Sequence, residues 1–141
     1  MNDSRDIDDL QPLAAAKCRV MLKACAVAGI DVLITATHRS LEESGRLYAQ
    51  GRTAPGKIVT KAKPGQSFHN WRVAWDCYPR INGQVQWAYE GVAKPLWDKM
   101  GEIAERNGIE WGHNWKSIKD TPHFQYTGGH TLPFFQQGGK L

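Results

Sequence analysis

The segment SFHNWRVAWDCYPRINGQVQW, residues 67–87, decides the fold that this sequence predicts. Two runs in it, Val73–Tyr78 and Gln84–Trp87, are rich in the β-branched and aromatic residues that favour strands. The run between them, Pro79–Gly83, contains Asn82-Gly83, the dipeptide that best tolerates positive φ in a hairpin turn. We therefore expect an antiparallel hairpin here.

Helices and further strands are predicted on both sides of this hairpin. Apolar residues recur with a helical period after Pro12, up to a stop at Gly29. Ser40 and Glu43 form a capping box for a second helix, which ends near Gln50. The remaining expected elements are a strand at Asp31–Ala36, a helix at Ala93–Asn107 and a strand at Pro122–Tyr126. Together they predict an α+β fold.

Two segments have no regular pattern. Arg52–Gln66, RTAPGKIVTKAKPGQ, combines Pro and Gly breakers with four cationic side chains, so we expect an exposed, mobile loop. The tail Gly128–Leu141 is rich in glycine, and the sequence does not place it.

Length and composition exclude several classes of protein. With 141 residues, the chain has the size of one domain, and we expect residues 1–141 to form it. No apolar run approaches the roughly 18 residues that a membrane span needs. The formal net charge of +4 favours anionic partners, and it fits nucleic acid, teichoic acid and peptidoglycan carboxylates equally well.

The N-terminus and the cysteines also bear on where the protein works. Met1–Asp9 is polar and acidic, unlike a secretory signal, so we expect no export signal. Cys18 and Cys25 lie two helical turns apart, roughly 10 Å, which is too far for a disulfide. We expect these two thiols and that of Cys77 to be reduced and buried.

A candidate metal site stands out among the histidines. His69 and Asp76 lie seven positions apart, so they can share a metal only if the chain bends between them, with His69 in the loop that enters the strand. His123 would be the third ligand, and two histidines with one carboxylate leave tetrahedral zinc an open position for water. From spacing alone, ordinary hydrogen-bonded surface residues remain the alternative.

Three segments carry a resemblance to a known family. Ser67–Asp76, SFHNWRVAWD, resembles the Ser-x-His-x-x-Gly-x-Ala-x-Asp motif of the zinc D-alanyl-D-alanine carboxypeptidase (VanY-like) metallopeptidases. Trp111–Gln125 resembles the second metal segment of that family, and Thr37–Ser40 resembles its Gly-Tyr-Arg-Ser segment. The similarity runs from Leu10 to Gln125. The chain departs from the family pattern at Arg72, which replaces glycine, at His113-Asn114 and at Ser44.

The resemblance implies a fold and a role for each site residue. It implies a Hedgehog/DD-peptidase-like fold, in which a small antiparallel sheet carries Zn²⁺ on His69, Asp76 and His123 and helices pack on one face. Asp120 would be the general acid/base, because a carboxylate must move the proton of the attacking water. Arg39 would stabilise the oxyanion or hold a substrate carboxylate. Ser67 would be a supporting hydrogen-bonding residue.

The expected function is hydrolysis of peptidoglycan peptides. Arg46–Thr53 and Pro55–Thr60 resemble phage endolysins that act as L-alanyl-D-glutamate endopeptidases. This implies a monomer without a wall-binding domain, made in the host cytoplasm and released by a holin for bacteriophage lysis, with antimicrobial action.

Three alternatives remain at this stage. One is a D-alanyl-D-alanine carboxypeptidase or dipeptidase. Another is a non-catalytic zinc or wall-binding module, against which the retention of Asp120 and Arg39 argues. The third is a nucleic-acid-binding domain, which no helix-turn-helix or RNA-binding motif supports.

Overall fold

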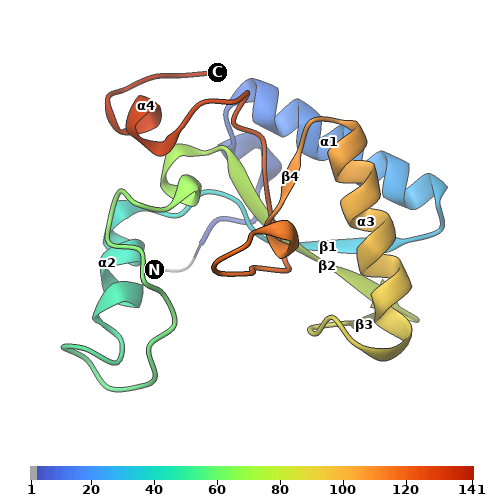
Figure 1. The fold of residues 1–141 in the computed structure, drawn as a ribbon, viewed down its shortest axis with the longest axis horizontal. Helices are drawn as coiled ribbons and strands as arrows, with labels where there is room; N and C mark the ends of the chain where they lie inside the picture. The colour runs from blue at the N-terminus through green and yellow to red at the C-terminus, as the bar shows by residue number, and fades with distance from the viewer. Residues whose placement is uncertain (1–2) are drawn as a thin grey trace.

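An antiparallel sheet organises the chain in the computed structural model, which describes residues 3–141 (Figure 1). Within those residues five strands pair in the order β1-β2-β5-β4, with β3 attached to the far end of β2. The strands are β1 (Asp31–Ala36), β2 (Ala74–Ile81), β3 (Gln84–Val85), β4 (Glu110–Trp111) and β5 (His123–Gln125). The predicted α+β fold with a small antiparallel sheet is confirmed.

Two helices cover one face of this sheet and build the core. They are α1 (Pro12–Val27) and α3 (Lys94–Arg106), and Figure 1 shows them lying on the same side. Their buried residues pack against alternate residues of β2 and β5: the core includes Met21, Cys25, Trp97 and Met100 from the helices and Trp75, Cys77 and Phe124 from the sheet. Because side chains alternate along a strand, the residues between these face the opposite side.

The opposite side carries the second helix and the loop that follows it. Helix α2 (Leu41–Ala49) lies away from α1 and α3 (Figure 1). The expectation that the helices pack on one face of the sheet therefore holds for α1 and α3 and not for α2. Residues 52–66 form no helix or strand and are mostly exposed, as predicted. Four 3-10 turns and a short helix complete the described chain: η1 (Ile7–Asp9), η2 (Phe68–Trp71), η3 (Gly91–Ala93), η4 (Gly112–Asn114) and α4 (Leu132–Gln136).

The hairpin forms with the predicted turn but with different strand lengths. Asn82 and Gly83 have φ of 51° and 79°, and Ile81 pairs with Gln84 across the turn. Strand β2 continues through Pro79, which had been assigned to the turn, because β1 pairs with it along this stretch and Val32 lies opposite Pro79. Strand β3 is correspondingly short. Pairing with β1 thus decides where β2 ends.

The other predicted boundaries agree closely with the structure. Gly29 and Gly108 end their helices with φ of 81° and 72°. The Ser40 hydroxyl accepts a hydrogen bond from the Glu43 amide, as a capping residue should, while the Glu43 carboxylate accepts two from Arg46. Strand β4 and helix α4 were not predicted. All three cysteines are buried thiols. Among residues 3–141, no helix has the length and apolarity needed to cross a bilayer.

Candidate metal centre

Two of the three predicted metal ligands meet through strand pairing. Asp76 in β2 lies directly opposite His123 in β5, and Asp76 Oδ1 is 3.6 Å from His123 Nδ1. Their neighbours Trp75 and Phe124 also face each other, and both are fully buried. The sheet pleat therefore turns the apolar pair into the core and the polar pair outward.

The third ligand, His69, reaches them from a sharp bend before β2. Two hydrogen bonds cap the start of its 3-10 turn, η2. The Ser67 hydroxyl accepts a hydrogen bond from the His69 amide, and the Asn70 side-chain oxygen accepts one from the Ser67 amide. Arg72 then takes a left-handed conformation, with φ of 63°, and turns the chain into the strand. This bend brings His69 Nε2 to 3.1 Å from Asp76 Oδ1.

Hydrogen bonds determine which nitrogen of each histidine can bind a metal. His69 Nδ1 lies 2.8 Å from the Thr37 carbonyl oxygen, which can only accept, so Nδ1 carries the proton and Nε2 keeps its lone pair. His123 Nε2 donates to Gln125 Oε1 at 2.8 Å. The Glu110 carboxylate orients the Gln125 amide, because it accepts a hydrogen bond from Gln125 Nε2 at 3.1 Å. His123 therefore keeps its lone pair on Nδ1, which faces Asp76.

These atoms fit a zinc ion. The donor atoms of the three residues all lie within 4.8 Å of one another, and they are the one such group of His, Cys, Asp and Glu found in residues 3–141. Tetrahedral ligands about 2.0–2.1 Å from zinc stand about 3.3 Å apart, close to the 3.1 and 3.6 Å seen around Asp76. Partners that fix the protonation state and orientation of ligand histidines are typical of metal sites.

The electrostatics favour an ionised carboxylate. Burial would raise the pKa of Asp76, but the facing rings of His69 and His123 hold that pKa well below its ordinary value. Burial alone would lower the pKa of His123. The adjacent Asp76 carboxylate has the opposite and larger effect, so the pKa of His123 is raised. The Asp76 carboxylate thus carries its negative charge at neutral pH, as a metal ligand must.

Asp120 lies beside this cluster, as its predicted catalytic role requires. Its Oδ2 is 3.8 Å from His123 Nδ1, and both residues line the same pocket of about 290 Å³. Burial raises the pKa of the Asp120 carboxyl, an effect that the Asp76 carboxylate reinforces and the neighbouring His123 opposes. A raised pKa suits a carboxyl that takes up and returns a proton.

The Asp120 backbone is held by Gly112. Gly112 O accepts from the amides of Asp120 and Trp115 at 3.0 and 3.2 Å. A Cβ on Gly112 would lie 2.5 Å from the Asp120 carbonyl oxygen, so this approach requires glycine. Trp115 forms one wall of the pocket, with its ring centroid 5.0 Å from that of His123.

Arg39 reaches the pocket but is already paired. Its Nε and Nη2 donate to the two carboxylate oxygens of Asp3, both at 2.9 Å. The remaining hydrogens of the guanidinium are available to a substrate, so its predicted role stays a prediction. The Arg39–Asp3 contact was not foreseen.

Three polar residues that support the site were missed from the sequence. Asn70 joins the His69 turn to α2, because its Nδ2 donates to Arg39 O at 3.0 Å and Ser44 Oγ at 2.8 Å. Gln125 and Glu110 orient His123. The alternation along the Pro122–Tyr126 strand, which places Gln125 on the His123 face, was the available signal for Gln125. The histidines outside the cluster have other partners, such as Thr121 for His113 and the Phe134 ring for His130.

Comparisons with known proteins agree with this geometry. Residues 60–126 match the family described as D-alanyl-D-alanine carboxypeptidase. The peptidoglycan L-alanyl-D-glutamate endopeptidase CwlK of Bacillus subtilis (strain 168) is 41% identical over 122 residues, which cover 83% of this chain and 73% of CwlK.

Solved structures share the fold. The L-Ala D-Glu endopeptidase ChiX of Serratia marcescens has a TM-score of 0.63 at 20% identity, covering 86% of this chain and 83% of ChiX. The D,D-pentapeptidase VanY from a VanB-type resistance cassette, solved with Zn(II), has a TM-score of 0.62 at 13% identity, covering 92% of this chain and 80% of VanY.

Proposed function

The chain belongs to the D-alanyl-D-alanine carboxypeptidase family of peptidases, and from this premise we propose that it is a zinc peptidase that cuts the stem peptides of bacterial peptidoglycan. The proposed bond joins L-alanine to D-glutamate, the bond for which its relative CwlK is named. The observation that carries the proposal is the convergence of two histidine lone pairs and one carboxylate beside Asp120 in an open pocket.

Five residues of the pocket have a part in the proposed reaction. His69, Asp76 and His123 would hold a zinc ion, which when bound would polarise the scissile carbonyl and lower the pKa of water to roughly 7. Asp120 accepts the proton of the attacking water and passes it to the leaving amine. Arg39 presents the donors that Asp3 does not occupy to the oxygen of the scissile carbonyl.

Digestion of purified peptidoglycan tests the proposal. Mass spectrometry of the zinc-loaded reaction should show peptides with a new N-terminal D-glutamate, leaving L-alanine on the muramic acid. His69→Ala and His123→Ala should lose both bound zinc and turnover, whereas His130→Ala, a histidine outside the cluster, should keep both. Release of free D-alanine would instead identify a carboxypeptidase, and full zinc content in both ligand variants would refute the ligand assignment.

We also propose that the protein acts as a monomeric bacteriophage lysis enzyme, made in the host cytoplasm and released to the wall by a holin. The resemblance of Arg46–Thr53 to phage endolysins supports this role. Induced expression should lyse bacteria when a holin is co-expressed and leave them intact without it. Lysis without the holin would contradict this route.

A further inference from the structure

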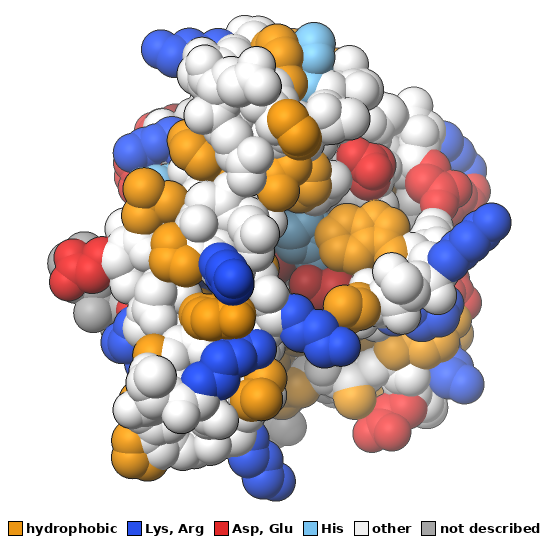
Figure 2. Space-filling model, turned by 60° about the vertical axis from the view of Figure 1, so that its left-hand side comes forward, with side chains coloured by type: hydrophobic (Ala, Val, Ile, Leu, Met, Phe, Trp, Pro, Cys, Tyr) orange, Lys and Arg blue, Asp and Glu red, His pale blue; other side chains and the backbone are white. Residues whose placement is uncertain are grey.

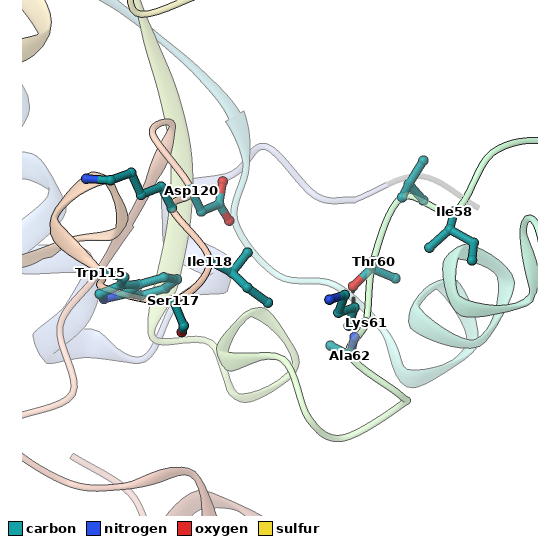
Figure 3. Close-up of a pocket in the computed structure, with 10 residues that line it drawn as sticks. Ile58, Thr60, Lys61, Ala62, Trp115, Ser117, Ile118 and Asp120 are labelled. Carbon is teal, nitrogen blue, oxygen red and sulfur yellow. Dashed lines mark hydrogen bonds between the residues drawn. The ribbon is translucent and has the colours of Figure 1, made fainter.

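A groove continues from the metal pocket between two loops. Its walls are residues 58–62 on one side and Trp115 with residues 117–120 on the other, and it encloses about 690 Å³. It shares Thr60, Ala62, Trp115 and Asp120 with the metal pocket, so the two hollows are continuous. Figure 3 shows the two walls facing each other across open space, with the Asp120 carboxylate directed into it.

The proposed chemistry indicates which fragment of the substrate occupies this groove. Asp120 returns the proton to the leaving amine, so the fragment on the amine side of the scissile bond must begin next to Asp120. Because Asp120 belongs to both hollows, the groove beyond it is the place for that fragment. This step rests on the proposed function.

Lys61 lines this groove and is exposed. No hydrogen bond or ion pair to another of residues 3–141 holds its ammonium, and it extends from the loop wall opposite Ile118 (Figure 3). The other lysine of the groove, Lys119, donates to the His113 carbonyl at 3.0 Å. Figure 2 shows a hollow with histidine and acidic side chains on its floor and basic side chains beside it.

The leaving residue carries a matching charge. D-glutamate in a stem peptide is joined to the next residue through its γ-carboxyl, so its α-carboxylate is free on the carbon next to the scissile nitrogen. We propose that Lys61 binds this α-carboxylate, while the apolar side chains of Ile118 and Trp115 line the path of the following chain. The groove thereby selects stem peptides whose D-glutamate has a free acid rather than an amide.

Two synthetic peptides test this selection. One contains L-alanyl-γ-D-glutamyl-L-lysine, and the other contains D-isoglutamine, in which the α-carboxylate is an amide. For the zinc-loaded protein, kcat/KM should be about twofold to fivefold higher for the acid, the modest size expected of a pair at an exposed ammonium. Lys61→Ala should remove this preference by slowing the acid peptide alone, and Lys61→Arg should keep it.

Lys57 provides the matched control, because it lies in the same loop but does not line the groove. Lys57→Ala should retain the preference, and all variants should retain zinc. Equal cleavage of both peptides by the unmodified protein, or an equal loss on both in Lys61→Ala, would overturn the inference and leave the proposed function standing. Cleavage of neither peptide by the zinc-loaded protein would overturn both.

Discussion

At the scale of single residues, Gln125 decides how well His123 binds a metal. Its side chain accepts the His123 Nε2 proton and donates to Glu110, so the lone pair on Nδ1 is held toward Asp76. We expect Gln125→Ala to weaken zinc binding by about 10-fold to 100-fold, the usual effect of removing such a partner. Chelator competition measures the change.

The exposed Gln137, for which no side-chain hydrogen bond is found within residues 3–141, provides the control. Gln137→Ala should bind zinc like the unmodified protein. An unchanged zinc affinity in Gln125→Ala would show that strand pairing alone orients His123.

A substitution at Asp120 should affect turnover without affecting zinc binding. Its carboxylate is near the cluster but outside the set of three donor atoms. Asp120→Asn preserves the shape of the side chain and removes its ability to accept a proton at neutral pH, so turnover should fall by about 10²-fold to 10⁴-fold. Zinc content should be unchanged. Near-normal turnover in this variant would exclude Asp120 as the proton carrier.

At the scale of elements, η4 positions the loop that carries Asp120. The Gly112 carbonyl holds two amides of this loop, and an added Cβ would meet the Asp120 carbonyl at 2.5 Å and His123 Cβ at 3.2 Å. We expect Gly112→Ala to cost about 1–3 kcal/mol of stability. Turnover should fall at least about tenfold, because small displacements of catalytic groups are costly.

Gly45 in α2 is the control for this substitution. An added Cβ there meets only Pro64 Cγ at 3.6 Å, an ordinary contact. Gly45→Ala should therefore leave turnover near that of the unmodified protein and should not lower the melting temperature, because Ala is the better helix former. Normal turnover in a folded Gly112→Ala would show that the loop tolerates displacement.

Elements with a strong local pattern could be predicted from the sequence. Helices α1 and α3 have a clear apolar period and a glycine stop, and β1 has the predicted bounds. Strand β4 could not be found this way, because its two residues become a strand only by pairing with β5. The same limit applies to the site: the resemblance of Ser67–Asp76 and Trp111–Gln125 to family motifs pointed to His69, Asp76 and His123, whereas the contacts of Asn70 and Asp3 depend on segments far apart in sequence.

Arg72 shows how a departure from a motif can be accommodated. The position needs a left-handed conformation, which explains the glycine of the family motif. Arg72 adopts it nonetheless, and its Nη1 donates to the Asp9 carbonyl at 2.9 Å while its own carbonyl accepts from the Gln11 amide. Contacts with the N-terminal segment thus offset part of the backbone cost.

At the scale of the whole molecule, the three proposed metal ligands come from parts of the chain that are distant in sequence. His69 and Asp76 flank the bend into β2, and His123 comes from β5. The hydrophobic core includes none of His69, Asp76 and His123, so the chain should remain folded when zinc is removed. Zinc should then add stability by binding the folded state alone.

The size of this stabilisation follows from mass action. At a zinc concentration about 1,000 times Kd, the gain is about 4 kcal/mol, which for a domain of this size raises Tm by about 10 °C. Thermal unfolding with zinc and with EDTA measures the difference. His69→Ala should show no zinc-dependent shift, because the bend into β2 then carries no ligand. An unfolded chain in EDTA would mean that the ion organises the fold, and equal Tm values for the unmodified protein would mean that these three residues do not hold it.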